Sequence, residues 1–541
     1  MGKRNLSLKT LLEDIEPNEL LVASSAIPSP DTVNLQGHEA YSQDKWLKLL
    51  TQLYVLNFKN QHHRSIKSQI TDFCRLVKEC SQEDPYLTAQ CIIYSRCVSD
   101  GMRTTSQIAA ALLAKYAPGQ EWIKRFFLLW DKKGSRGGVI FRADDMAKIV
   151  EYSQSLSGGT LPNAIKKSFK KNLESLDSYS ILKYKRKLID VINLVHPSPG
   201  VNPDHLTEID GQKVQVITAV IKGMSISADT WEVAQSEAGE LVAQAKRDGK
   251  VSEEDAQKIL DEAKAENWKS LLDEKKLGIL AALRNLRSIL NLNPDEDVIE
   301  KITLLIENQR LIKEGKIMPY HFDLAVESLQ SIESNPQLRT VLASLNKSYE
   351  ESIPNLKEAL KGRNLVMLDC SGSMNTPMYD PRTKLRMTTS CLDKGKLLAA
   401  TLAKATNADV IRFGSMSEFV SWDPSLGVFA LADTLVDDMG GTYLGGAWKF
   451  AADSQRKYDR VFIISDNECN VGSTYFQYQK YVAKVGDPYV YSIDLAGYGT
   501  NAIAGPKVRY YFGYGYSLFE DLEKNEFDPE FHLEKVKKIF I

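Results

Sequence analysis

The spacing of apolar residues divides the chain into two parts with different patterns. From about residue 42 to 361, apolar side chains recur every three or four positions, which is the period of a half-buried α-helix. Short breaks such as SGGTLP, HPSPGVNP and LNPDED separate these segments, and no strand pattern alternates with them. We therefore predict stacked helix pairs in the manner of an α-solenoid. The clearest stripes are Ile66, Ile70, Phe73 and Val77; Val298, Ile302, Leu305 and Ile312; and Leu338, Val341, Leu345 and Tyr349.

After Arg363 the pattern changes to short runs that are rich in β-branched residues. These runs are NLVMLD, NADVIRFG, RVFIIS and PYVYSIDLA, and helical segments such as KGKLLAATLAKAT and GGAWKFAADSQRKY lie between them. Alternation of strand and helix predicts a parallel sheet with helices on both faces. We therefore expect two domains, a helical one over residues 1–361 and a doubly wound, Rossmann-like α/β domain over residues 362–541.

Composition adds little to this division but excludes some classes of protein. A chain of 541 residues with 43% hydrophobic content is too long for a single core. The net charge of -2 gives no global attraction to a polyanion, so a nucleic-acid site would have to be a local basic patch. Seven scattered cysteines without a CxxC pair, and an N-terminus without an apolar signal core, predict a cytoplasmic protein with reduced thiols. No apolar run is long enough to span a bilayer.

One candidate site follows the first predicted strand of the α/β domain. Asp369 ends NLVMLD, and Ser371 and Ser373 follow at alternate positions. Thr442, between glycines, and Asp466, after RVFIIS, are expected at the same edge, because ligands bind beyond the carboxyl ends of parallel strands. Carboxylate and hydroxyl oxygens suit Mg²⁺ or another divalent cation, with a position left open for an external carboxylate or phosphate.

Three other interpretations of D-x-S-x-S were compared with the metal site. The residues are ordinary turn formers, so the motif alone could be a turn. A G-x-S-x-G nucleophile elbow fails because Asp369 stands where glycine is required. A D-x-D aspartyl nucleophile fails because Ser371 replaces the second carboxylate and leaves no acid–base partner. The sequence therefore predicts no enzyme.

The second candidate site is a basic stretch at residues 160–187, in which two acids, Glu174 and Asp177, accompany eight basic residues. Such a patch attracts phosphate groups and releases their counterions. The alternative is a solvated helix face, which is where charge runs usually belong. The basic residues are Lys166, Lys167, Lys170, Lys171, Lys183, Lys185, Arg186 and Lys187.

The motifs resemble those of a known family. DCSGSM with Thr442 and Asp466 resembles the metal-ion-dependent adhesion site of von Willebrand factor A domains. NKSYEESIPNLKEALKGRNLVMLDCSGSM resembles the junction in the Ro ribonucleoprotein autoantigen family, in which a TROVE module precedes an A-type domain. LAALRNLRSIL and KEGKIMPYHFDLA are further matches, so the resemblance extends from about residue 30 to the end.

This resemblance implies both a fold and a function. It implies a ring of HEAT-like helical repeats, closed by the A-type domain. It implies binding of small noncoding Y RNAs on the outer ring and of single-stranded ends of misfolded RNAs in the hole, in RNA quality control and without catalysis. Within the family's Y RNA motif, Lys183, Lys187 and His196 occupy the matching positions, although the gap before His196 is shorter than usual.

Several residues in these regions stay open to other interpretations. His196 precedes Pro197 and could equally end a helix. The segment KKGSRGG at residues 132–138 could contact phosphate or could be a connection, and Arg103 and Arg142 are weaker candidates for the RNA path. The HHR sequence at residues 62–64 lacks a third ligand nearby, so it predicts no metal site.

Two functions of different classes remain at this point. The first is an RNA-binding protein that carries Mg²⁺ in its A-type domain. The second is a protein-interaction scaffold, in which the cation captures a carboxylate from an acidic partner protein. A nuclease partner is compatible with the first, no membrane is expected, and a ring closed within one chain predicts a monomer.

Overall fold

The computed structural model of the chain divides into two compact units, which are described separately. One unit contains residues 74–353 and 534–541, and the other contains residues up to 73 together with 354–533. The N-terminal segment that was searched for a secretory signal lies outside the described residues. The described residues are 27–56, 58, 61–99, 101–131, 136–198, 206–209, 212–224, 252–314, 317, 319–352, 360–375, 390–513, 518, 521–522 and 530–541.

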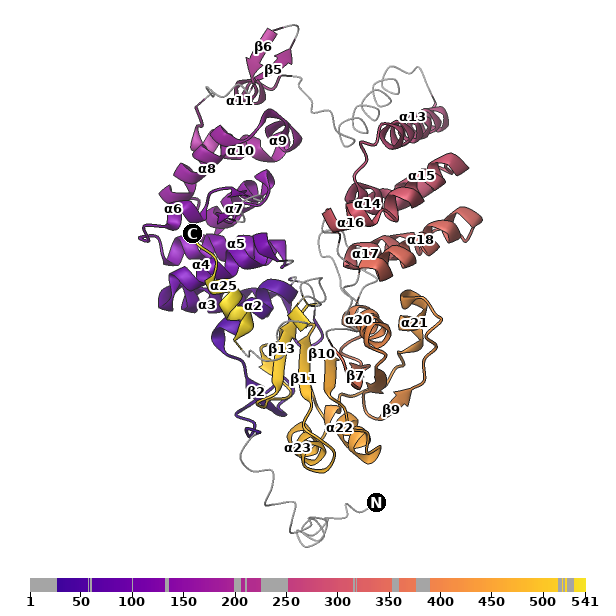
Figure 1. Ribbon diagram of the computed structural model, residues 1–541. Helices are drawn as coiled ribbons and strands as arrows, with labels where there is room; N and C mark the ends of the chain where they lie inside the picture. The colour runs from indigo at the N-terminus through magenta and orange to yellow at the C-terminus, as the bar shows by residue number, and fades with distance from the viewer. Residues whose placement is uncertain are drawn as a thin grey trace. The chain divides into compact units, whose positions relative to one another are not determined.

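The first unit is built from helices, as the three-to-four spacing predicts. Helices that are near but not consecutive in the chain lie side by side, for example α5 against α7 and α7 against α10 (Figure 1). The described helices are α3 (Ile66–Glu83), α4 (Pro85–Ile93), η1 (Tyr94–Val98, a π-helix), α5 (Arg103–Tyr116), α6 (Ile123–Phe126), α7 (Ala143–Leu156), α8 (Asn163–Ser175), α9 (Ser178–Lys183), α10 (Lys185–Val195), α11 (Val216–Ile221), α13 (Glu253–Asp273), α14 (Ile279–Leu290), α15 (Glu296–Ile306), α16 (Gln309–Glu314), α17 (Pro319–Leu329) and α18 (Pro336–Ser352). The first of these, α3, begins in the other unit.

Most of the predicted apolar stripes are buried in this unit. Val77, Val298 and Ile302 are buried, whereas Ile70, which was predicted to share their role, is exposed. Asp295 begins α15 by accepting a hydrogen bond from the amide of Val298, which is the usual N-cap arrangement. The helical prediction is therefore confirmed for the stripes, Ile70 included, and only the expected burial of Ile70 is wrong.

The helical region contains two short hairpins that the sequence did not predict. Strand β3 (Trp130–Asp131) pairs with β4 (Arg136–Gly137), and β5 (Leu206–Ile209) pairs with β6 (Gln212–Gln215). Gly137 has a φ of +116°, and a Cβ there would lie 2.5 Å from the carbonyl oxygen of Leu129. A glycine is therefore required at this position of β4, and strands of two to four residues are too short to show an alternating pattern.

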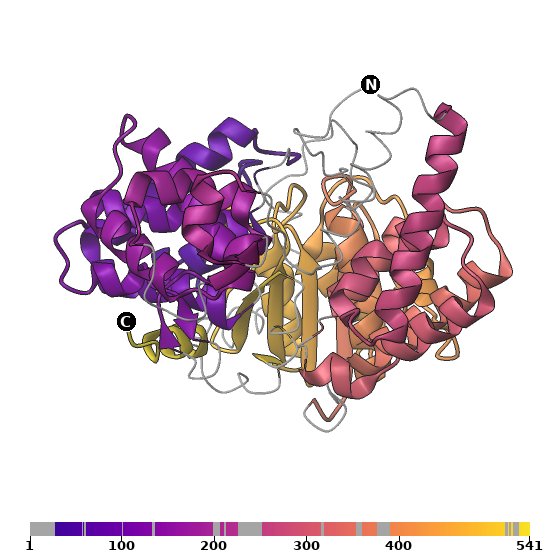
Figure 2. The same ribbon diagram turned by 90° about the horizontal axis from the view of Figure 1, so that it is seen from above.

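The second unit holds a six-stranded, mainly parallel sheet in the order β13-β11-β10-β7-β8-β9, with the antiparallel β9 at one edge. Figure 2 shows the strands of this sheet side by side. Two of the predicted strands, NLVMLD and RVFIIS, coincide with β7 and β10. The bounds are β7 (Asn364–Asp369), α20 (Cys391–Thr406), β8 (Asp409–Phe413), β9 (Ser417–Val420), α21 (Val428–Thr434), α22 (Leu444–Asp453), β10 (Arg460–Ser465), α23 (Thr474–Lys484), β11 (Tyr489–Asp494), β13 (Val508–Phe512) and α25 (Phe531–Lys537), the last of which ends in the helical unit.

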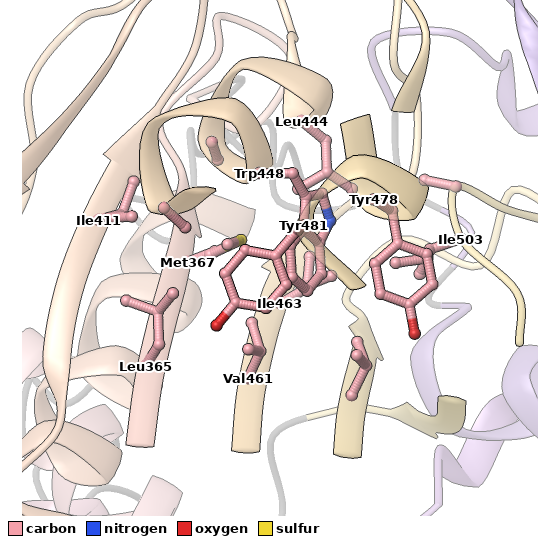
Figure 3. Packing of buried hydrophobic residues seen from close by; sticks show 14 of the residues in the cluster. Leu365, Met367, Ile411, Leu444, Trp448, Val461, Ile463, Tyr478, Tyr481 and Ile503 are labelled. Atoms are coloured by element: carbon pink, nitrogen blue, oxygen red, sulfur yellow. The ribbon is translucent and has the colours of Figure 1, made fainter. Parts of the chain in front are cut away.

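Both faces of this sheet are covered by helices. On one face, Met367, Val461 and Ile463 pack against Trp448 of α22 and Tyr481 of α23 (Figure 3). The other face is covered by α20, where a Cβ on Gly395 would lie 3.3 Å from the side chains of Leu368 and Ile464. Neighbouring residues of one strand thus point to opposite helical layers, and the predicted doubly wound α/β fold is confirmed.

The boundary between the units differs from the predicted one at residue 361. Residues 27–73 belong to the α/β unit, because β2 (Glu39–Ser42) pairs with both β1 (Thr32–Val33) and β12 (Thr500–Asn501). Helix α2 (Lys45–Val55) packs on β13 and buries Leu49, Leu50 and Leu53 completely. The sequence did not show this, because strand pairing between segments more than 450 residues apart leaves no local pattern. Closure of the helices into a ring stays a prediction.

Candidate metal centre and nucleic-acid interface

The predicted metal-binding residues do converge at one edge of the sheet. Strands β7, β8 and β10 run parallel, so Asp369 at the end of β7 and Asp466 just after β10 reach the same edge. The amide of Gly372 donates to the carbonyl oxygen of Gly440 at 2.7 Å, which holds the D-x-S-x-S loop against the loop that carries Thr442. Asp369, Ser371, Thr442 and Asp466 are buried, and Ser373 is half-buried.

Hydrogen bonds fix the orientation of the Asp369 carboxylate. The amide of Ser371 donates to Oδ1 of Asp369 at 2.9 Å, and the hydroxyl of Ser465 donates to Oδ2 at 2.6 Å. The hydroxyls of Ser371 and Ser373 lie 3.1 Å apart. These contacts are also those of an Asx-type turn, so the turn interpretation and the metal interpretation describe the same loop.

The two carboxylates are electrostatically strained without a counter-charge. Burial, and then the charge of Asp466, raises the pKa of Asp369 to about 7. Burial likewise raises the pKa of Asp466, although the amide of Glu468 and the hydroxyl of Ser373 act in the opposite direction. A divalent cation between the two carboxylates would remove both penalties.

The donor set fits a hard cation. Oδ2 of Asp466 is buried and has no hydrogen-bond partner among the described residues, which leaves a carboxylate oxygen available as a ligand. No group of three or more His, Cys, Asp or Glu side chains suited to a metal occurs in the described part of the chain. A cation at this edge would therefore be held by Asp369 and Asp466 together with the hydroxyls of Ser371, Ser373 and Thr442, which is oxygen chemistry of the Mg²⁺ type.

Sequence reasoning missed four other polar groups that surround this edge. Ser465, buried at the end of β10, orients Asp369, and Glu468 is fully buried with its pKa raised to about 8 by burial and by Asp466. Burial raises the pKa of Asp494, at the end of β11, to about 6. His63 lies near enough for its charge to act on Asp466. The positions of Ser465 and Asp494 at strand ends were the only sequence signal that could have identified them.

The lysines of α8 form the clearest basic surface. Lys166, Lys167 and Lys171 are exposed and Lys170 is half-buried, while Ile165, Phe169 and Leu173 of the same helix are buried. No acidic side chain of the described residues pairs with any of these four lysines. The α8 lysines therefore present uncompensated positive charge to solvent.

The remaining predicted RNA-binding residues are divided between the two ends of α10. Lys183, Lys185, Arg186 and Lys187 lie at or just before its N-terminus. His196 is the exposed C-cap residue of α10, with a φ of 47° and its amide bonded to the carbonyl oxygen of Ile192. The structure thus gives His196 the helix-ending role of the alternative prediction and separates it from Lys187 by the length of the helix, about 13 Å at 1.5 Å per residue.

Two weaker candidates lie in one polar network on α5 and α7. Arg103 and Arg142 both contact the buried Asp144, as does Lys187. Of the predicted loop at 132–138, residues 132–135 lie outside the described residues, and Arg136 and Gly137 form β4. The sequence motif did not show that Lys187 is tied to an acid from another helix.

Residues 251–396 match the family model of the TROVE domain. The crystal structure of the Ro (RSR) protein of Deinococcus radiodurans is similar over 89% of this chain and 100% of its own, with a TM-score of 0.57 and 15% sequence identity. Residues 251–396 are thus similar to a TROVE domain, and the chain has the fold of the solved Ro protein. The resemblance predicted from the motifs is confirmed to that extent, and no curated protein sequence matches the chain.

No helix in the described ranges is both long and apolar enough to cross a bilayer.

Proposed function

We propose that this chain is a non-catalytic RNA-binding protein of the Ro type, acting in cytoplasmic RNA quality control. It binds small structured noncoding RNA, similar to Y RNA, on the surface of α8 and the N-terminus of α10, and it binds single-stranded ends of misfolded RNA. The TROVE domain and the Ro fold support the class of partner. The observation that supports this location of the RNA-binding surface is the set of α8 lysines.

The lack of acidic partners around these four neighbouring lysines supports a binding surface over an ordinary solvated helix face. Some lysines of the same unit are neutralised: Lys301 pairs with Asp273 and Asp297, each at 2.6 Å, and Lys347 pairs with Glu307 at 2.6 Å. The α8 lysines have no such partners among the described residues, so they repel one another. An external polyanion would reduce this repulsion. RNA phosphates supply that charge, and counterion release adds to the affinity.

Binding to RNA across a salt series tests this function. We would compare a hairpin that carries a single-stranded 3′ tail with the same hairpin made blunt, using Lys167→Gln/Lys171→Gln beside the wild type. Lys301→Gln is the matched control, because it removes a lysine that is already paired. We expect steep salt dependence, tail-dependent affinity, and a slope of log K against log salt that falls by about 1–2 in the double variant only.

Affinity that hardly changes between low and moderate salt would reject the phosphate-binding surface. Equal loss in Lys301→Gln would show that the effect is general charge and does not belong to α8.

The metal centre supports a second candidate function, capture of an acidic partner protein. The buried Asp466 oxygen without a partner, beside Asp369 and the serine hydroxyls, fits a Mg²⁺ ion, and the ion's open position would accept a carboxylate from outside. Because the α8 lysines and this centre lie in different units, both functions can coexist.

Direct binding of Mg²⁺ tests the first requirement of this candidate. Calorimetric titration should show one site in the wild type and none in Asp466→Asn, while Asp433→Asn, an exposed aspartate on α21, should behave as the wild type does. In a second step, Asp369→Ala should abolish capture of an acidic peptide and leave RNA binding unchanged. Mg²⁺ binding that survives Asp466→Asn would remove the structural basis of this candidate.

A further inference from the structure

Three cationic side chains converge on one buried carboxylate in the helical unit. Asp144, on α7, has a side chain that is only 2% exposed. Nη2 of Arg103 lies 2.8 Å and Nε of Arg142 lies 3.6 Å from its Oδ1, while Nζ of Lys187 lies 2.9 Å from its Oδ2. These residues come from α5, the start of α7 and α10, so the cluster is assembled from three separate helices.

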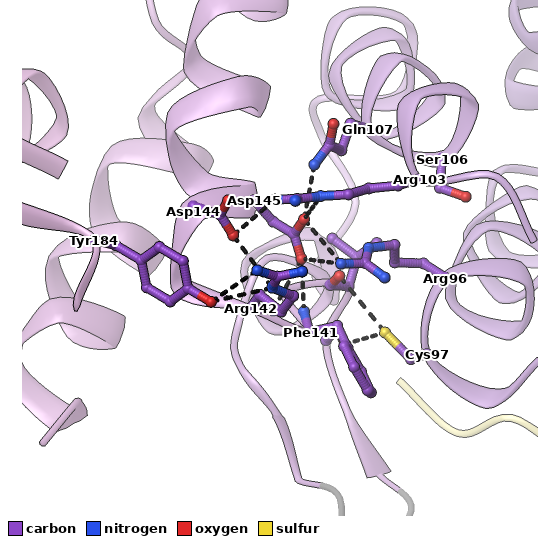
Figure 4. Close-up of polar contacts among 12 residues, drawn as sticks. Arg96, Cys97, Arg103, Ser106, Gln107, Phe141, Arg142, Asp144, Asp145 and Tyr184 are labelled. Carbon is purple, nitrogen blue, oxygen red and sulfur yellow. Dashed lines mark hydrogen bonds and ion pairs between the residues drawn. The ribbon is translucent and has the colours of Figure 1, made fainter. Parts of the chain in front are cut away.

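The neighbouring carboxylate, Asp145, accepts hydrogen bonds on both of its oxygens and so fixes the side chains around it. It accepts from Arg96 at 2.8 and 3.0 Å, from Nε of Arg103 at 2.8 Å and from Gln107 at 2.7 Å (Figure 4). The amides of Phe141 and Arg142 donate to it as well. With so many donors fixed on one carboxylate, Arg103 is held in place before any ligand arrives.

The cluster keeps excess positive charge. Four cations, namely Arg96, Arg103, Arg142 and Lys187, face two carboxylates, which leaves two positive charges unbalanced. The side chains of Arg103, Arg142 and Lys187 remain 31%, 38% and 60% exposed. Three partly exposed cations around a single buried anion therefore give this part of the unit a concentrated positive charge.

The donor atoms also leave capacity for a ligand. Arg103 donates a hydrogen bond through Nε to Asp145, while its Nη2, which forms the ion pair with Asp144, has no hydrogen-bond partner among the described residues. Nε and Nη2 of Arg142 both donate to the hydroxyl of Tyr184, at 3.2 and 2.9 Å. Within the described residues, nothing accepts a hydrogen bond from Nη1 of either arginine. Lys187 uses one of its three ammonium hydrogens on Asp144. The Arg142 guanidinium also lies over the Tyr184 ring, 5.6 Å from its centroid.

We propose that Arg103, Arg142 and Lys187 bind the terminal phosphate of an RNA strand. The excess of two charges matches a phosphate monoester, which carries about −1.5 to −2 at neutral pH, better than it matches an internal phosphodiester, which carries one negative charge. Two guanidinium groups and an ammonium can donate together to the three terminal oxygens of a monoester. This inference rests on the proposed RNA-binding function and names a specific end-recognition site within it.

Three forms of one RNA hairpin with a single-stranded tail test the inference. The forms carry a 5′-monophosphate, a 3′-monophosphate or hydroxyls at both ends. We expect one phosphorylated form to bind about tenfold more tightly than the hydroxyl form, which corresponds to the gain from hydrogen bonds to a charged group. Arg142→Gln and Lys187→Gln should each reduce this ratio to about one.

Two further variants keep the test sharp. Lys148→Gln is the matched control. Lys148 lies on α7, as Asp144 does, is 40% exposed and pairs with Glu151 outside the cluster, so the ratio of affinities for the phosphorylated and hydroxyl forms should stay as in the wild type. Tyr184→Phe removes only the hydroxyl that accepts from Arg142, and should lower the ratio in part without disturbing the fold.

The outcomes distinguish the terminal-phosphate site from the proposed RNA-binding function. RNA binding with no preference for a phosphorylated end, or a preference that survives in both Arg142→Gln and Lys187→Gln, rejects the terminal-phosphate site and leaves the proposed function standing. No binding to any of the three RNAs rejects both.

Discussion

Lys187 and Asp144 form an ion pair between α10 and α7, with 2.9 Å between Nζ and Oδ2. Lys187, which we predicted to bind RNA, is thus also a contact between two helices of the same unit. Because its side chain is 60% exposed, water screens the pair, and we expect Lys187→Gln to lower the free energy of unfolding by less than about 1 kcal/mol. Urea unfolding measures this, and a loss of several kcal/mol would show that the variant cannot report on RNA binding.

For Asp145, in contrast, we expect substitution to lower the free energy of unfolding strongly. Its carboxylate is buried and compensates Arg96, whose side chain is only 10% exposed. We expect Asp145→Asn to destabilise the helical unit by about 3–5 kcal/mol, because it leaves a buried guanidinium without its counter-charge. Thermal melting followed by circular dichroism measures the loss. Glu151→Gln, which removes an exposed partner of Lys148, is the control and should change stability by less than about 0.5 kcal/mol.

The buried carboxylates of the α/β unit predict a dependence of stability on pH. The pKa values of Asp369 and Asp494 are raised from 3.8 to about 7 and about 6, chiefly by burial. The folded chain therefore keeps protons that the unfolded chain releases, so stability is lost as pH rises from about 4 to about 7. In EDTA, the melting temperature should be lower at pH 7.5 than at pH 5, and Asp494→Asn should reduce the difference. A melting temperature that rises over this interval would contradict the assignment.

The core between the sheet and α22 predicts how much stability a cavity in the α/β unit would cost. Trp448 is fully buried between the sheet and the rings of Tyr478 and Tyr481, whose centroids lie 4.7 and 5.2 Å away. Trp448→Ala should therefore destabilise the α/β unit by about 3–5 kcal/mol through the cavity that it leaves. Phe450 lies on the same helix but is 37% exposed, so Phe450→Ala should cost much less in the same denaturation experiment.

The sequence predicts those parts of the fold that depend on local pattern. Strands β7 and β10 are continuous apolar runs because both of their faces are covered, and their ends place Asp369 and Asp466 at one edge. The antiparallel β9 was not predicted, because its residues are all half-buried and show neither a continuous run nor an alternation. The metal-centre residues could be identified because strand ends are recognisable, whereas Glu468 depends on how loops fold over the edge.

Long-range relationships stayed hidden for a physical reason. In the sequence, Asp144 and Asp145 look like ordinary acidic residues in the first turn of a helix, where negative charge interacts favourably with the helix dipole. Only the packing of α5 and α10 against α7 converts them into the base of a cationic cluster. In the same way, Lys183, Lys187 and His196 are close in sequence, but α10 separates the last from the other two.

The pairing of β2 with β12 also has a consequence for how the protein is made. The two parts of the α/β unit are separated by about 280 residues of helical unit, so the N-terminal strand and α2 leave the ribosome long before their partners exist. Because β12 follows β2 by about 460 residues, the delay at 5–20 residues per second is roughly 25–90 s. During that interval the apolar face of α2 lacks β13, the strand on which it packs in the folded unit, so α2 reaches its native burial only after the last strands have been synthesised.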